Sequence, residues 1–115
     1  GTEAANHWER GVLNSPQNVY ARHISLAVDG VPRLIARSLT TPDHAVVELM
    51  QGLGERPLAE LLFTDPLWVR DKHAVYLQTP CGLPGRGVLW CHQDHQQQLL
   101  VEEFFLPALL QSAAK

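Results

Sequence analysis

The chain has 115 residues, a length that fits one domain with a modest hydrophobic core. Hydrophobic residues make up 45% and charged residues 18%, a composition typical of a folded globular protein rather than a disordered one. The net charge of -3 argues against general nucleic-acid binding, because phosphate contacts need a basic face. No apolar run approaches the roughly 20 residues of a membrane-spanning helix, and the first residues lack a secretory-signal pattern, so we expect a cytoplasmic protein without membrane insertion.

The first readable feature along the chain is a β-hairpin. Before it, residues 7–13 (HWERGVL) fit a short strand, and residues 14–18 (NSPQN) fit a loop or turn. Residues 19–28 and 31–40 then predict two strands joined at Asp29-Gly30. An Asp-Gly pair between alternating apolar residues is a strong signal for a two-residue turn.

A continuous ladder from this turn places Arg22 directly opposite Arg37, with both side chains on one face of the sheet. Like charges in that arrangement are destabilising unless something compensates them. An anion bound between the two guanidiniums is one explanation, because charge-assisted hydrogen bonds are strong in a dry site. The alternatives are a pair that faces solvent, or a structural bridge to Glu102, Glu103 or another acid.

The middle of the chain predicts two helices. Residues 41–54 start with Thr41 as the N-cap and end at Gly52 or Gly54. Residues 56–63 (RPLAELLF) have leucines at spacings of three and four, which is typical of a second, short helix.

Strands return in the last third of the chain. Residues 67–79 predict a strand, residues 80–87 a loop rich in Gly and Pro, and residues 88–93 and 99–107 a second hairpin. Strands, then helices, then strands again indicate a single α+β domain over residues 1–115, with a mostly antiparallel sheet and a helical layer on one side.

The last predicted strand carries one carboxylate on each face. Glu103 shares a face with Val101 and Phe105, and Glu102 lies on the other face. Burial raises the pKa of a carboxyl group, which can then exchange a proton near neutrality. A salt bridge to an arginine across the sheet is the structural alternative, and this argument does not separate the two glutamates.

No metal or cofactor is expected from the motifs. Residues 91–95 (CHQDH) contain the atoms of a zinc site, but the second ligand cluster of a structural zinc motif is missing. Cys81 and Cys91 fit a reduced pair, although spacing alone leaves a disulfide open. The glycines of residues 80–87 lack the strand-to-helix context of a phosphate-binding loop.

Four segments together resemble the chorismate pyruvate-lyase family, also called chorismate lyase or 4-hydroxybenzoate synthase. They are ARHISLAVDGVPRLIARS, LGERPLAELLFTDP, GLPGRG and LLVEEFFLPAL, in this order and at spacing similar to that of the family. The resemblance implies a chorismate lyase-like fold and an enzyme that splits chorismate into 4-hydroxybenzoate and pyruvate for ubiquinone biosynthesis. It also implies that the enzyme works without a cofactor or metal.

The same resemblance implies four site residues. Arg22 corresponds to the arginine that holds the ring carboxylate, and Arg37 corresponds to its cross-strand neighbour, placed to hold the second carboxylate of the substrate. Leu58 corresponds to the leucine whose backbone lines the pocket. Glu103, rather than Glu102, corresponds to the essential glutamate before the FLP motif, and we expect it to transfer the proton or to polarise the ring hydroxyl.

The match starts only near the first strand of the hairpin, so we expect the N-terminal helical cover of the family to be missing. Water entry would then weaken catalysis and product retention. The first alternative to an enzyme is a non-catalytic module that binds an aromatic acid, as in effector domains of bacterial transcription regulators that share the fold. The second is a structural or partner-binding domain in which the arginines only bridge acids.

Overall fold

The computed structural model describes residues 1–14, 18–42, 45–54, 56–93 and 97–107. No helix in this part of the chain is long and apolar enough to cross a membrane. In chain order, the elements are β1 (Thr2–Ala4), α1 (His7–Leu13), β2 (Asn18–Val28), β3 (Val31–Thr40), α2 (Val46–Leu53), α3 (Leu58–Thr64), β4 (Trp68–Arg70), β5 (Val75–Gln78), β6 (Pro84–His92) and β7 (Gln98–Phe105).

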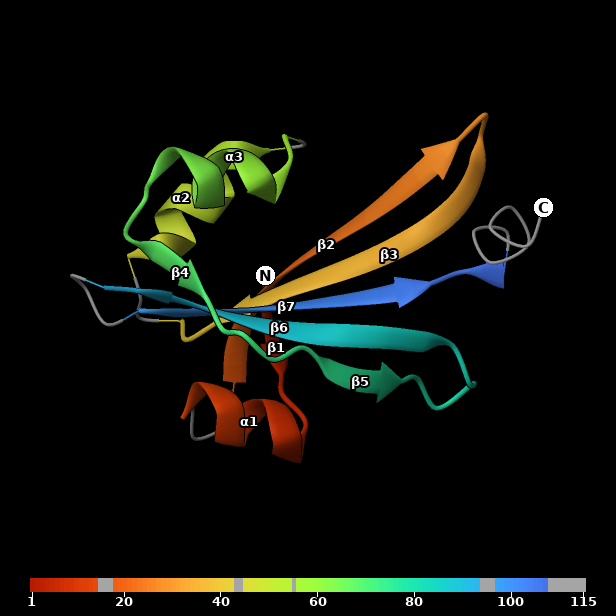
Figure 1. Cartoon of the computed structure of the whole chain (residues 1–115), viewed down its shortest axis with the longest axis horizontal. Helices are drawn as coiled ribbons and strands as arrows, with labels where there is room; N and C mark the ends of the chain where they lie inside the picture. Colours follow the sequence, from red (N-terminus) through yellow and green to blue (C-terminus); the bar gives the residue numbers. More distant parts are fainter. Residues whose placement is uncertain (15–17, 43–44, 55, 94–96, 108–115) are drawn as a thin grey trace.

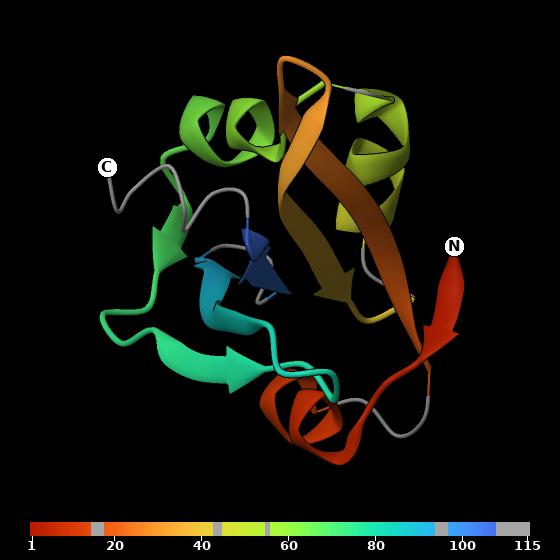
Figure 2. The same ribbon diagram turned by 90° about the vertical axis from the view of Figure 1, so that its right-hand side faces the viewer.

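The strands form one antiparallel sheet in the order β1-β2-β3-β7-β6-β4, with β5 also paired to β6. Helices α2 and α3 cover one face of this sheet, and α1 lies against the other (Figures 1 and 2). The predicted α+β class, with a mostly antiparallel sheet and a helical layer on one face, is therefore confirmed. The helix on the second face is an addition that the sequence analysis did not predict.

Two clusters of apolar side chains hold the layers together. Under α2 and α3, the fully buried Val46, Met50 and Leu99 belong to one cluster. Leu39 and Leu100 belong to the other, which packs against α1. Because both faces are covered near the middle of the sheet, the alternating side chains of β3 and β7 are buried on both sides there.

Residues 7–13 form helix α1, so the prediction of a short strand was wrong. Asn6 caps the helix: its side chain accepts a hydrogen bond from the Glu9 backbone, and the Glu9 side chain accepts one from the Asn6 backbone. This reciprocal arrangement is a capping box, which satisfies two backbone donors at the helix start. The pattern of Asn followed three residues later by Glu was the available signal.

The tip of the hairpin is as predicted, but its ladder is not. Asp29 and Gly30 have φ angles of 53° and 77°, as a two-residue turn of this kind requires, and Val28 pairs with Val31. The register then shifts at a β-bulge, because Ala27 pairs with Pro32 whereas the preceding residue of β2 pairs with Leu34.

Pro32 gives the physical reason for this shift. Proline has no backbone N–H to donate to a ladder, so in sheets it occurs at edges and bulges. Arg33 is the extra residue, and its carbonyl oxygen accepts a hydrogen bond from the backbone N–H of Leu106 instead.

The bulge separates the two arginines. Arg22 pairs with Ser38, and Arg37 pairs with His23. A slip of one residue moves a side chain to the other face of a sheet. The prediction that Arg22 and Arg37 lie opposite each other on one face was therefore wrong.

Three other boundaries differ from the predictions. Helix α2 has Ala45 rather than Thr41 at its N-cap, although it ends as predicted at Gly54, whose φ of 59° favours glycine. Residues 67–79 form two short strands instead of one. Strand β6 begins at Pro84, so part of the predicted loop of residues 80–87 is strand.

Candidate functional site

A cavity of about 460 Å³ lies between α3 and the sheet face that carries Arg22. Strands β2, β3, β6 and β7 all contribute side chains to it. The residues that matter for its chemistry are Arg22, Ala36, Ser38, Leu58, Arg86 and Glu103. Arg22, Leu58 and Glu103 are three of the four site residues implied by the family resemblance, and one cavity brings them together.

Small side chains on β3 form the floor of this cavity. Ser38 pairs with Arg22 on β2, and Ala36 pairs with Glu103 on β7. Arg22 and Glu103 are therefore two strand spacings apart across the sheet and offset by two residues along it, which puts their backbones about 12 Å apart. Because the intervening strand presents only a methyl group and a hydroxymethyl group, the space between the guanidinium and the carboxylate stays open.

Arg22 is a buried arginine with unused hydrogen-bonding capacity. Only 9% of the residue is exposed, and its Nη2 donates to the carbonyl oxygens of Gly54 and Arg56, at 3.2 and 2.5 Å. Its Nη1 is buried and has no partner among the residues that the structure describes. Buried polar groups are almost always hydrogen-bonded, so this atom marks a position where an acceptor from a ligand fits.

Leu58 enters the cavity as the first residue of α3. Pro57 precedes it at the N-cap in an extended conformation, as expected for a residue that fixes the chain direction at a helix start. The carbonyls that hold Arg22 belong to the connection between α2 and α3. This connection therefore fixes Arg22 and Leu58 relative to each other.

Glu103 faces the same cavity and is paired with Arg86. The two residues are opposite each other on β7 and β6, and Arg86 Nε donates to Glu103 Oε1 at 3.0 Å. About a quarter of the Glu103 side chain is exposed, at 24%. The pair thus presents an oriented carboxylate to the cavity at a distance from Arg22.

Arg37 lies on the opposite face, where each of its three nitrogen atoms donates a hydrogen bond to a glutamate. Its Nε and Nη2 donate to Glu3 at 3.2 and 3.0 Å, and its Nη1 contacts Glu9 at 2.5 Å and Glu102 at 3.4 Å. Glu3 also pairs with His23. The structure therefore places Arg37 in an ion-pair network that joins α1 to the sheet, away from Arg22.

Glu102 is the buried carboxyl that meets the sequence criterion of a raised pKa, but it does not line the cavity. Burial raises its pKa to about 8, the hydrogen bond to Glu9 and the charge of Glu9 add to the shift, and Arg37 opposes it. Only 3% of the residue is exposed. The register thus separates the two glutamates, which the sequence pattern alone could not do.

The raised pKa predicts a dependence of stability on pH. A free glutamate ionises near 4.5, whereas folded Glu102 keeps its proton up to about 8, so the folded state binds more protons between these values. The free energy of unfolding therefore falls as the pH rises through this interval. In Glu102→Gln the group stays neutral, and we expect a protein equal to wild type near the lower limit and more stable above the upper one by up to about 5 kcal/mol.

Urea unfolding across this pH interval measures the difference between the two proteins. Glu103→Gln is the matched control, since it removes the neighbouring carboxylate from the other face and keeps Glu102, so a fall in stability with rising pH should remain. If the free energies of unfolding of wild type and Glu102→Gln differ by a constant amount at every pH in this interval, the shifted pKa does not belong to Glu102.

No metal-binding cluster of three or more His, Cys, Asp or Glu side chains occurs among the described residues. Asp94 and His95 of the CHQDH segment lie outside them. Cys81 is exposed, Cys91 is partly buried, and both are free thiols. His92 instead pairs with Asp65, with 2.8 Å between Nε2 and Oδ2, and its ring packs edge-on against Trp68.

The fold has a counterpart among solved structures. It matches the crystal structure of the ligand-binding domain of a "putative GntR-family transcriptional regulator" from Bordetella bronchiseptica with a TM-score of 0.57, covering 93% of this chain and 81% of that one. The sequence identity is 13%, so this likeness shows the fold alone. The chain is therefore an α+β domain with the fold of that ligand-binding domain and a cavity between its sheet and its helices.

Curated relatives confirm the resemblance that the sequence analysis described. The chain is 35% identical over 109 residues to a protein named "Probable chorismate pyruvate-lyase" from Bordetella pertussis, covering 78% of this chain and 57% of the relative. A protein of the same name from Cupriavidus metallidurans is 30% identical over 130 residues, covering 96% and 60%. The chain thus spans about three fifths of the length of these relatives. No protein-family model matches it.

Sequence reasoning missed Ala36, Ser38 and Arg86 as cavity residues. If a bulge is placed next to Pro32, the pairing shifts by one residue, and alternation along β3 then puts Ala36 and Ser38 on the same face as Arg22. Arg86 lay in a segment interpreted as loop because it contains Gly and Pro. The available signal was that the GLPGRG segment, which contains Arg86, is one of the four segments that resemble the family.

Proposed function

We propose that this chain is a chorismate pyruvate-lyase, which eliminates pyruvate from chorismate to give 4-hydroxybenzoate. The observation that supports the proposal most is the buried, unpartnered Nη1 of Arg22 in a cavity that also holds Glu103. An arginine in a dry site binds a carboxylate strongly, and the ring carboxylate of chorismate supplies one. The names of the curated relatives point to the same reaction.

The proposed reaction needs little beyond positioning and one proton carrier. The ring carbon that bears the hydroxyl loses a proton, and the adjacent carbon–oxygen bond breaks with its electron pair going to the enolpyruvate oxygen. The ring becomes aromatic, and the enolate gains a proton on carbon to become pyruvate. Arg22 holds the ring carboxylate, the cavity orients the ring over Ala36 and Ser38, and Glu103 moves the proton.

A direct assay tests this proposal. The protein is incubated with chorismate, 4-hydroxybenzoate formation is followed by absorbance, and the dissociation constant of 4-hydroxybenzoate is measured by calorimetry. For Glu103→Gln we expect kcat to fall by a factor of about 100 or more, with a much smaller change in product affinity, because proton transfer by a placed side chain contributes at least that factor. Glu102→Gln, the matched control on the other face, should keep kcat within about threefold of wild type.

The second candidate is a module that binds aromatic acids without turnover, which a shared fold permits because fold does not determine reaction. Binding of 4-hydroxybenzoate with no conversion of chorismate would favour it. A protein that binds neither compound, with no shift in melting temperature, would instead support a structural domain. A loss of kcat in Glu102→Gln but not in Glu103→Gln would contradict the assignment of Glu103.

A further inference from the structure

The cavity is unusual in its charge. Among the described residues that line it, three are arginines (Arg22, Arg56 and Arg86), whereas Glu103 is the one acid. The whole chain has a net charge of -3, so this local excess of guanidiniums does not follow from composition. A cavity of this kind favours an anion with more than one negative charge.

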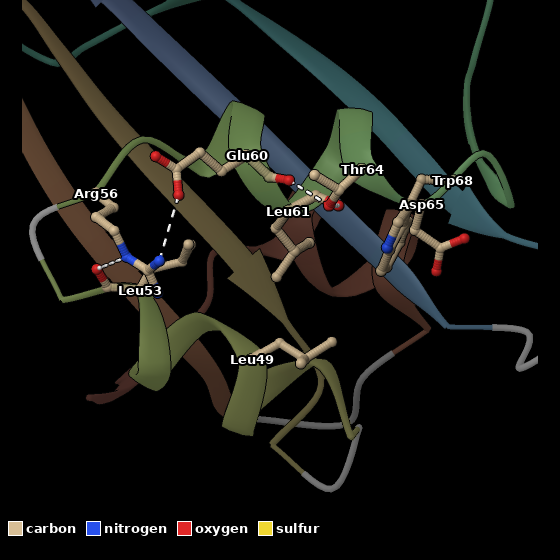
Figure 3. Close-up of a pocket in the computed structure, with 8 residues that line it drawn as sticks. All are labelled: Leu49, Leu53, Arg56, Glu60, Leu61, Thr64, Asp65 and Trp68. Carbon is tan, nitrogen blue, oxygen red and sulfur yellow. Dashed lines mark hydrogen bonds and ion pairs between the residues drawn. The ribbon is translucent and has the colours of Figure 1, made fainter.

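Arg56 is already committed to the protein. Its Nε donates to the Leu53 carbonyl at 3.2 Å and its Nη2 to the Gly52 carbonyl at 3.0 Å. Its Nη1 lies 3.5 Å from a carboxylate oxygen of Glu60 (Figure 3). These contacts tie the guanidinium to the end of α2 and to α3, so each of its three nitrogen atoms already has a partner in the protein.

Arg86 has nitrogen atoms without such a partner. Its Nε bonds to Glu103, but neither Nη1 nor Nη2 has a partner within the described part of the chain. Its side chain is 49% exposed, whereas Arg22 is buried, so Arg86 marks the solvent side of the cavity. One guanidinium can serve several carboxylates at once, as Arg37 does in this protein with Glu3, Glu9 and Glu102.

We propose that Arg86 binds the second carboxylate of a dianionic ligand whose first carboxylate is held by Arg22. This inference rests on the proposed function and names a residue for its substrate specificity. Arg86 thereby takes the role that the sequence analysis gave to Arg37, which lies on the opposite face because of the bulge. In chorismate, the second carboxylate belongs to the enolpyruvyl group, so that group points to the solvent side and leaves from there.

The test compares a ligand with two carboxylates to a ligand with one. In Arg86→Gln we expect the KM for chorismate to rise about tenfold, since a half-exposed ion pair is partly screened by water. The dissociation constant of 4-hydroxybenzoate, which has one carboxylate, should stay within about threefold of wild type. Arg86→Lys should recover part of the loss, because it keeps the charge without the planar fork.

Arg56→Gln is the matched control, an arginine of the same cavity that should leave the ratio of the two affinities unchanged. Equal weakening of both ligands in Arg86→Gln would mean that Arg86 does not recognise the second carboxylate, and no weakening would mean that it does not contact the ligand; either result overturns the inference. If wild type binds chorismate without turnover, its dissociation constant replaces KM. The proposed reaction is then wrong, but the comparison of dissociation constants still tests whether Arg86 binds the second carboxylate. A wild type that binds neither ligand overturns both.

Discussion

Arg22→Gln is expected to weaken binding of 4-hydroxybenzoate by a factor of about 100 or more. The reason is the loss of a charge-assisted contact in a buried position, where each hydrogen bond to a charged group contributes about 1.5–3 kcal/mol. Calorimetric titration of the variant measures it. The same substitution removes the two hydrogen bonds from Nη2 to the connection between α2 and α3, so we also expect a loss of stability.

Arg22→Lys sharpens this experiment. Lysine keeps the positive charge but cannot reach two backbone carbonyls and a ligand carboxylate with one planar group. It should therefore bind 4-hydroxybenzoate more weakly than wild type and more tightly than Arg22→Gln. If Arg22→Gln stays folded and binds with wild-type affinity, Arg22 does not belong to the site.

Arg37→Gln should do the opposite, with a large effect on stability and little effect on binding. It leaves the carboxyl groups of Glu9 and Glu102 buried without their common partner, and breaking a buried ion pair in this way costs about 3 kcal/mol or more. Urea unfolding measures the loss. Among molecules that remain folded, we expect the dissociation constant of 4-hydroxybenzoate to stay within about threefold of wild type.

A second substitution tests the cause of that loss. In the Arg37→Gln background, Glu9→Gln removes the buried carboxylate that has lost its charged partner, so the double variant should be more stable than the sum of the two single effects predicts. Additive effects would mean that the two side chains do not interact. A loss of ligand binding in a fully folded Arg37 variant would show that Arg37 reaches the cavity, against the register of β2 and β3.

Arg22 and Arg37 show which features can be predicted from the sequence pattern and which cannot. The Asp29-Gly30 turn, the existence of both strands and the end of α2 at Gly54 are local features, and each was predicted from neighbouring residues. The identity of the opposing residues is not local, because one unpaired residue at a bulge changes every pair beyond it. Pro32 was a visible warning, but it does not say where the extra residue falls.

For Glu102 and Glu103, too, the sequence predicts only part of the arrangement. Alternation along β7 shows that Glu102 and Glu103 face opposite sides, and this much is independent of the rest of the fold. Which side holds a cavity depends on what covers the sheet. Helix α1 brings Glu9 onto the face of Glu102, and α3 leaves space over Glu103.

The sequence by itself determined the α+β class, the succession of hairpin, helices and strands after residue 18, and the resemblance that selects Arg22, Leu58 and Glu103. Such features depend on periodicity, turn chemistry and short ordered motifs, which are properties of neighbouring residues. Only the tertiary structure decided that Arg37 belongs to an ion-pair network and that Arg86 faces the cavity. Those assignments depend on strand register and on the layers above each face, which arise from contacts between residues far apart in the chain.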